Sequence, residues 1–285
     1  FVQAVETKQQ VLVFTNKTLH GLKYIGAAFT FGLQELSKNI TIMGPSAAIA
    51  VDDSVFWMGV DTFYAYAGGQ TQQMPCTVKD KVFLDFNTEE RDKVHAGLNT
   101  EFGEIFWFYP TASSTEIDAY VVYNYLERTW YYGTMARQAW LDRGIRSLPV
   151  ATGGQYLYNH EVGYDDDGSA MTSFIESSPI DIGDGDKFSL VQKVIPDLTF
   201  EGSVNQSTPA ANFTLKARNE PGEDYGNTSA GTATRTATSP VELFTNQLDL
   251  RVRGRSFALR VDSDATGMKW KLGSPRVSIR PDGRR

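Results

Sequence analysis

The sequence has little cysteine and no long apolar run. Cys76 is its single cysteine among 285 residues, which excludes an internal disulfide and a cysteine-rich zinc or iron–sulfur cluster. We expect this thiol to pack as a small apolar side chain. No run approaches the roughly 18 apolar residues of a spanning helix, so we predict no membrane insertion.

Motifs of catalytic chemistry are missing as well. The sequence has no G-x-S-x-G nucleophile elbow, no P-loop, no H-E-x-x-H pair and no dinucleotide fingerprint. The histidines His20, His95 and His160 are 75 and 65 residues apart, so we expect structural roles for them. Carboxylate pairs for glycoside hydrolysis could be drawn from Glu101, Glu104 or Asp118, but an acidic chain supplies such pairs by chance. We predict that the chain is not an enzyme and binds no cofactor.

Two acidic turns partly resemble calcium loops. Residues 164–169 and 181–186 place carboxylates at short spacing beside glycine, as calcium-binding loops do. Neither segment has the full EF-hand pattern or a glutamate at the closing position. We therefore interpret both as polar turns between strands and predict no metal site. The weak calcium candidates are Asp165, Asp167, Asp184 and Asp186.

Positive charge is scarce overall and concentrated at one end. The net charge of −7, from 27 Lys and Arg against 34 Asp and Glu, argues against a dedicated nucleic-acid binder. Residues 246–285 nevertheless hold ten basic and four acidic side chains, a net +6 that leaves −13 on residues 1–245. This end is either a solvated strand face or a docking surface for an acidic neighbour, which would set orientation and association rate. The interface candidates are Arg276, Arg280, Arg284 and Arg285.

Aromatic strands dominate the first part of the chain. Strand-forming runs occupy residues 54–59, 62–67, 105–109, 119–125, 130–133 and 155–160. The series restarts near residues 54, 105 and 155, a spacing of roughly 50 residues that is typical of four-stranded propeller blades. The alternative is an antiparallel sandwich with an aromatic core. Residues 134–143 have helical spacing and predict either a helix or irregular chain.

The composition changes near residue 169, where aromatic residues become rarer. β-branched strands are predicted at residues 171–177, 188–200, 213–218, 247–253, 256–262 and 268–279. A tight turn at residues 253–255 predicts a hairpin with one apolar face, and residues 219–240 predict a long surface loop. The predicted fold is all-β in two parts. Residues 1–168 form a propeller-like region of about three aromatic blades, incomplete at the amino end, and residues 169–285 form a β-sandwich-like carboxyl-terminal unit.

Several aromatic or basic segments carry a resemblance to a known family. They are residues 55–59, with the sequence Val55-Phe56-Trp57-Met58-Gly59, and residues 99–110, 123–133, 254–261 and 270–285. Together they resemble the carboxyl-terminal portion of bacteriophage tail-nozzle proteins, also called tail tubular protein B. The chain begins at Phe1 with strand-forming residues, so we expect it to be a piece of a longer protein.

The resemblance implies a structural virion component. It implies copies of the chain in a ring of six, which continues the tail channel for genome exit and contacts other tail proteins such as the adaptor and fibres. DNA would pass without specific binding, since an acidic lumen repels it. The protein would be assembled in the host cytoplasm and located in the virion.

Two other functions stay open, a carbohydrate- or surface-binding propeller and a hydrolase with a scattered active site. Exposure of Trp57, Trp107 and Trp130 separates the first from a ring subunit, because a sugar-binding protein leaves an indole face open in a groove. In a ring subunit we expect all three in the core or at an interface, and we predict that Trp57 and Trp107 are buried in blade cores.

Overall fold

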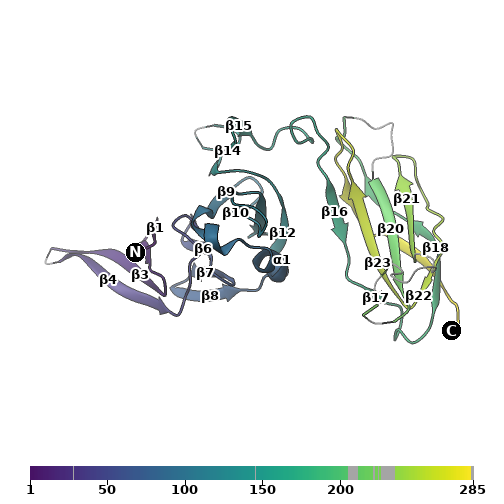
Figure 1. Cartoon of the computed structure of the whole chain (residues 1–285), viewed down its shortest axis with the longest axis horizontal. Coiled ribbons are helices and arrows are strands. Elements are labelled where there is room, and N and C mark those ends of the chain that lie inside the picture. The colour runs from purple at the N-terminus through teal and green to yellow at the C-terminus, as the bar shows by residue number, and fades with distance from the viewer. Residues whose placement is uncertain are drawn as a thin grey trace. The chain divides into compact units, whose positions relative to one another are not determined.

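A computed structural model describes residues 1–27, 29–144, 146–204, 211–220, 222–223, 225 and 235–283. The predicted all-β fold is confirmed, since the described elements are antiparallel strands apart from α1 (Lys79–Leu84) and the 3-10 helix η1 (Thr88–Lys93). The chain divides into two compact units, Phe1–Val162 (unit 1) and Gly163–Arg285 (unit 2), whose strands Figure 1 labels. The boundary predicted from the sequence, between residues 168 and 169, lies six residues after the observed boundary between residues 162 and 163. Across the described ranges, no helix combines the length and apolarity needed to cross a membrane.

Four antiparallel sheets follow one another along unit 1, each with its strands in sequence order. The first contains β1 (Gln3–Glu6), β2 (Val11–Phe14), β3 (Thr18–Gly26) and β4 (Thr30–Lys38). The second contains β5 (Ala48–Val51), β6 (Ser54–Met58), β7 (Phe63–Ala67) and β8 (Gln70–Met74). The third contains β9 (His95–Asn99), β10 (Glu104–Tyr109), β11 (Ala119–Asn124) and β12 (Thr129–Thr134). The fourth contains β13 (Ala139–Leu141), β14 (Val150–Gly153) and β15 (Tyr156–Asn159).

The first strands of successive sheets are neighbours. β1 contacts β5, β5 contacts β9, and β9 contacts β13. The backbone N–H of Ala96 donates to the carbonyl of Ser46, which joins the segments at β5 and β9. Inner strands of successive propeller blades have this relation, so unit 1 is propeller-like. It has four such sheets where the aromatic series predicted about three, because the β1–β4 sheet contains no tryptophan to mark it.

Aromatic rings fill the core of unit 1. Trp57 and Trp107 are fully buried, which confirms the predicted burial of both. The ring of Phe63 lies 5.0 Å from that of Trp107 and 4.7 Å from that of Trp130. All residues of β10 after Glu104 are buried, so both faces of this strand are covered. A strand covered on both faces needs consecutive apolar residues, which is why the sequence here does not alternate.

Of the two alternatives predicted for residues 134–143, a helix or irregular chain, the helix is wrong. Three of these residues form strand β13, and tertiary contacts of Trp140 explain the difference. Its indole N–H donates to the carbonyl of Leu98 at 2.9 Å, and its ring lies 5.1 Å from that of Phe106. A side chain on Gly97 would collide with this indole, so the glycine makes room for it. Docking against the third sheet therefore overrides the helical spacing.

Unit 2 is a sandwich of two sheets. One sheet has the order β16 (Ser173–Glu176), β23 (Ser256–Ser263), β20 (Ala211–Arg218) and β21 (Thr236–Val241), with β17 (Ile180–Asp181) also paired to β23. The other has the order β22 (Val252–Gly254), β18 (Ser189–Ile195) and β25 (Arg276–Pro281). A short pair joins β19 (Leu198–Thr199) to β24 (Lys271–Leu272). Phe213 and Leu215 of β20 share one core with Val191 and Val194 of β18, and β20 alternates buried and half-buried residues along its length.

The predicted hairpin around residues 253–255 is also wrong. β22 pairs with β18, whereas β23 pairs with β16, β17 and β20, so the chain changes sheets at Gly254. A Cβ atom on Gly254 would lie 2.8 Å from both the Cβ of Ala217 and the carbonyl oxygen of Arg218. The apolar faces on either side of the turn were correctly identified, but they face one another across the sandwich.

The loop predicted at residues 219–240 ends earlier in the structure than the sequence indicated. Its last five residues belong to β21, because their Thr-rich sequence pairs with β20, and the hydroxyls of Thr214 and Thr238 lie 2.9 Å apart. Residues 221, 224 and 226–234 of this segment lie outside the described part of the chain.

Candidate interaction surface

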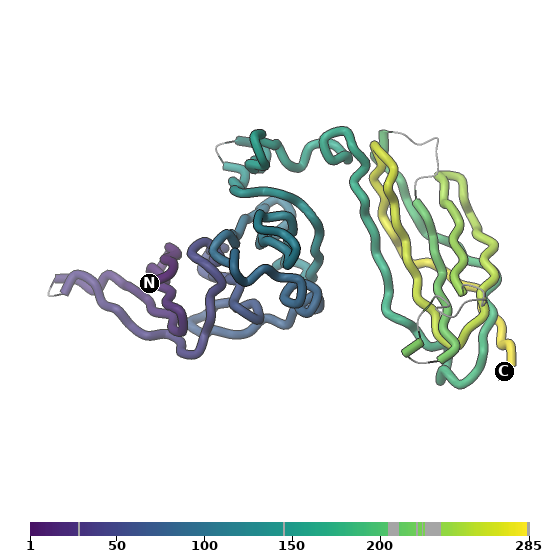
Figure 2. Tube along the Cα trace, in the orientation of Figure 1, coloured from purple at the N-terminus to yellow at the C-terminus, as the bar shows by residue number. Residues whose placement is uncertain are grey.

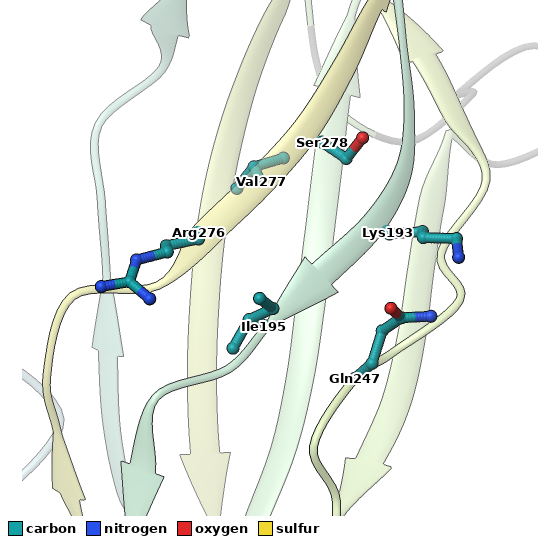
Figure 3. A pocket seen from close by; sticks show the side chains of 6 residues that line it. All are labelled: Lys193, Ile195, Gln247, Arg276, Val277 and Ser278. Atoms are coloured by element: carbon teal, nitrogen blue, oxygen red, sulfur yellow. The ribbon is translucent and has the colours of Figure 1, made fainter.

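A shallow groove of about 230 Å³ lies on the sheet that contains β18 and β25. It is lined by Lys193, Ile195, Gln247, Arg276, Val277 and Ser278. Figure 3 shows Arg276 and Lys193 on opposite sides of Ile195. The groove thus combines two cationic side chains with two partly exposed apolar ones, Ile195 and Val277, and has no carboxylate in its lining. This chemistry suits an acidic segment that also carries an apolar side chain.

The strand geometry of β25 places its arginines. Arg276 pairs with Ile195 and Arg280 with Leu190 in the register with β18. Because strand side chains alternate with a period of two, Arg276, Ser278 and Arg280 share one face of β25. Both arginines are exposed, and no ion pair to either occurs among the described residues. Of the four interface candidates, Arg284 and Arg285 lie outside the described residues.

Three arginines of the basic end, Arg253, Arg255 and Arg260, have partners within unit 2. Arg253 bonds to Asp282, and its guanidinium carbon lies 3.9 Å from the centre of the Phe188 ring. The guanidinium of Arg255 lies 2.8 Å from Glu220. The excess positive charge that the sequence shows is therefore partly paired inside the fold. Arg276 and Arg280 of β25, and Arg251 before β22, are exposed and form no ion pair among the described residues.

Arg260 belongs to a larger network on β23 and its neighbours. It lies 3.1 Å from both Glu176 and Asp262, and Glu176 also accepts a 2.7 Å hydrogen bond from Lys216. Burial opposes ionisation of Glu176, but the hydrogen bonds from Lys216 and Arg260 hold its pKa below the usual value. This outer face of the sheet is thus held together by charge pairs between strands.

The acidic turns serve as turns. The carboxylate of Asp165 accepts a hydrogen bond from the backbone N–H of Gly267, and Asp166 and Ser169 exchange two backbone hydrogen bonds of 2.9 Å. Over the ranges that the structure describes, no three His, Cys, Asp or Glu side chains are grouped to hold a metal ion. The calcium candidates Asp165, Asp167, Asp184 and Asp186 are accordingly not brought together there.

One polar cluster was not found by sequence reasoning. The fully buried Asn99 donates from its amide nitrogen to Glu161 at 2.9 Å and to Glu104 at 3.5 Å. Tyr131 donates its hydroxyl to Glu104 at 2.8 Å. Burial, with smaller contributions from neighbouring carboxylates, raises the pKa of both Glu104 and Glu161. The cluster connects β9 and β10 to the chain that follows β15, and no local sequence signal joins residues this far apart.

The other singled-out carboxylates make no hydrogen bond to this cluster, although Glu101 is near enough to help raise the pKa of Glu161. Glu101 pairs with Arg143 at 3.3 Å, and Asp118 accepts hydrogen bonds from the backbone and hydroxyl of Thr111. Glu104 is therefore the single member of that sequence-based set in the cluster.

The histidines and Cys76 have packing roles. His20 bonds to the hydroxyl of Thr18, and His160 accepts a 3.0 Å hydrogen bond from Arg137. His95 stacks on Phe108, and burial lowers its pKa. Cys76 packs against the core of unit 1, and burial raises its pKa to about 11, so it is a poor nucleophile near neutral pH.

All five tryptophans use their indole N–H groups internally. Each donates to a protein oxygen at 2.9 Å. The pairs are Trp57 with the Thr41 carbonyl, Trp107 with the Ala47 carbonyl, Trp130 with the Pro75 carbonyl, Trp140 with the Leu98 carbonyl, and Trp270 with the Ser173 hydroxyl. In unit 1 three of these bonds, those of Trp107, Trp130 and Trp140, tie one sheet to the sheet before it.

Comparisons with known proteins identify no family. No protein-family model matches the sequence, and no curated protein matches it. Among solved structures, a crystal structure of an exo-β-1,3-galactanase from Phanerochaete chrysosporium with galactose is similar over 93% of this chain and 76% of that chain. The sequence identity is 7% and the TM-score 0.27, a similarity too low to support any inference about this chain.

Proposed function

We propose that the chain is a structural ring subunit of a bacteriophage tail. In this role it is nozzle-like, forms part of the channel for genome exit, and gives neighbouring tail proteins such as the adaptor and fibres a surface to bind. The proposal extends the resemblance of the aromatic strands and the basic carboxyl end. It places no reaction in the protein.

The observation that carries the proposal is the way the tryptophans are used. Trp57 and Trp107 are fully buried, Trp130 is half-buried between Phe63 and Tyr123, and all three indoles donate to backbone carbonyls. A carbohydrate-binding protein needs an open aromatic face with polar groups around it. Rings buried between sheets serve rigidity instead, which a subunit under the load of a passing genome requires.

Charge distribution supports the same role. The net charge of −7 repels DNA that passes through a channel, whereas the exposed arginines of β25 offer a local site for an acidic neighbour. Both properties suit an assembly that transports DNA without holding it.

The alternative, a carbohydrate- or surface-binding propeller, is favoured by one observation. Tyr131, Tyr132 and Tyr156 of unit 1 are exposed, and exposed tyrosines can stack on sugars. Calorimetric titration with a panel of glycans tests it. We expect no saturable heat, and micromolar binding lost in Tyr156→Ala would favour the alternative.

Native mass spectrometry of the full chain, with negative-stain electron microscopy, tests the proposed function. We expect closed rings of six copies and no retention of double-stranded DNA at physiological salt. A chain that stays monomeric at high micromolar concentration would contradict the ring, and tight DNA binding would contradict the channel.

A further inference from the structure

The outer half of the β3–β4 hairpin exposes large apolar side chains. We call residues 23–27 and 29–33 the ribbon tip. Its exposed members, at 58–79% of their surface, are Tyr24, Ile25, Phe29, Phe31 and Leu33. Figures 1 and 2 show the hairpin running out beyond the rest of its sheet. Apolar surface this concentrated is typical of a binding site.

The ribbon tip is two strands wide. β2 pairs with β3 only as far as Leu22, and β4 is the edge strand of the sheet. Beyond Leu22, therefore, no strand in the described part of the chain pairs with the outer edge of either β3 or β4. An isolated two-stranded ribbon is marginally stable in water, and long apolar edges tend to pair with another chain.

Side chains of the ribbon tip nevertheless hold it in shape. The rings of Tyr24 and Phe31 meet edge to face at 6.1 Å, and Ile25 packs over Gly32. Paired positions of an antiparallel ribbon share a face, so Tyr24 and Phe31 lie on one face and Ile25 on the other. Phe29 lies in the turn. The ribbon tip therefore carries exposed apolar side chains on both faces and is preorganised, as a segment that enters a cleft needs to be.

Charge and backbone chemistry favour a protein cleft over lipid. Lys23 is the only charged residue of the ribbon tip, and a chain of net charge −7 attracts it. The unpaired N–H and C=O groups at both edges would each cost several kcal/mol in hydrocarbon, whereas a neighbouring chain can bond to them.

We propose that the ribbon tip inserts into a second copy of this chain, at a surface other than that copy's own ribbon tip. Such a heterologous contact repeats around a ring, whereas a tip-to-tip contact stops at a dimer. Large apolar side chains bury about 100–200 Å² each, so five of them with their counterpart surface reach the roughly 1,000 Å² of a specific interface. The inference rests on the proposed function only in requiring that the chain forms rings.

The first test removes the apolar side chains. The double variant Phe29→Ser/Phe31→Ser is compared with Leu84→Ser, which alters an equally exposed residue on α1. By sedimentation velocity we expect parent and control to form rings. The tip variant should stay monomeric at concentrations at least tenfold higher, with unchanged circular dichroism and melting temperature.

The outcomes separate the two proposals. Rings of the parent that persist unchanged in the tip variant overturn the ribbon-tip contact and leave the ring function standing. A parent that is monomeric at every concentration overturns both.

The second test identifies what the ribbon tip contacts. In the variant Phe29→Cys, a thiol-reactive photo-crosslinker is attached at position 29. Labelling is selective for this position because burial raises the pKa of Cys76 to about 11. Adding Cys76→Ala removes any label that Cys76 would still take. We expect mass spectrometry to find links between copies that join position 29 to residues outside the ribbon tip. Tip-to-tip links overturn the heterologous contact. The parent is also floated with phosphatidylcholine vesicles and with anionic vesicles. If the parent floats with either and the tip variant does not, the ribbon tip binds lipid and the proposed protein contact is wrong.

Discussion

Units 1 and 2 are both antiparallel β structures, yet they are stabilised differently. In unit 1 consecutive residues of β10 are buried and aromatic rings pack between sheets. In unit 2 β20 alternates, with its apolar side chains in the sandwich core and Thr214 and Lys216 on the outer face. The number of covered sheet faces thus decides the sequence pattern of a strand.

The two units also differ in the polar interactions that join their strands and sheets. Indole N–H groups of unit 1 bond to backbone carbonyls of neighbouring sheets, whereas unit 2 joins its strands with arginine ion pairs and arginine–ring contacts. We expect unit 1 to respond most to changes of packing and unit 2 to respond also to salt.

The largest expected effect is that of Trp107→Ala. Loss of a fully buried indole should destabilise unit 1 by about 3–5 kcal/mol, measured by urea unfolding. Trp107→Phe keeps a ring but leaves the Ala47 carbonyl without its donor, so it should cost about 1–3 kcal/mol. A loss below about 1 kcal/mol for the alanine variant would refute the dependence of unit 1 on its aromatic core.

Gly254→Ala should have the next largest effect. The added methyl would meet Ala217 and the backbone of Arg218 where the chain changes sheets, so we expect unit 2 to lose about 1–3 kcal/mol. Gly144→Ala, where nothing lies within 4 Å, is the matched control and should be close to neutral. Calorimetry measures the melting temperature of both variants. If Gly254→Ala melts at the same temperature as the parent, the close packing around Gly254 is contradicted.

The charge network of unit 2 should contribute less. A double-mutant cycle of Glu176→Ala and Arg260→Ala should give a coupling of roughly 1 kcal/mol at low salt, because both side chains are partly exposed. The coupling should fall in 0.5 M NaCl. A salt-independent value would show that packing of the side chains, not charge, makes the contribution.

Replacing Arg276, Arg280, Arg284 and Arg285 together by serine tests the basic end. Each exposed pair is worth roughly 0–1 kcal/mol, so only their sum should weaken binding to an acidic neighbour, most clearly at low salt. Ring or virion incorporation should fall while the melting temperature stays unchanged. If the serine variant assembles as well as the parent at low salt, the basic end is a solvated strand face and not a docking surface.

The smallest expected effect is a pH dependence at Glu104. Its folded pKa lies above the unfolded value because of burial, so the ionised side chain costs stability at pH 8. As pH falls through the raised folded value towards the unfolded one, the folded state binds the proton first and stability recovers. Glu104→Gln should therefore melt higher than the parent at pH 8, and the difference should narrow towards pH 4.5. If the melting temperatures of the variant and the parent differ by the same amount from pH 8 to pH 4.5, the raised pKa of Glu104 is contradicted.

Local sequence determined the strands and the buried rings. The runs around Trp57 and Trp107 predicted strands and their burial, because consecutive apolar side chains indicate a strand with both faces covered. The run at residues 213–218 likewise predicted a strand, which is part of β20. The roughly 50-residue spacing of the aromatic runs predicted successive blade-like sheets.

Tertiary structure alone decided which distant groups meet. Trp140 turned a helix-like stretch into a strand, and Gly254 sends β22 and β23 to different sheets. Asn99 joins Glu104 to Glu161, although nothing local connects them. The arginines of the basic end were visible in the sequence, but whether each one is paired depended on acids such as Asp282 and Glu220 that only the fold brings near. Side-chain periodicity acts over a few residues, whereas pairing partners, sheet changes and ion pairs are fixed by contacts between segments far apart in the chain.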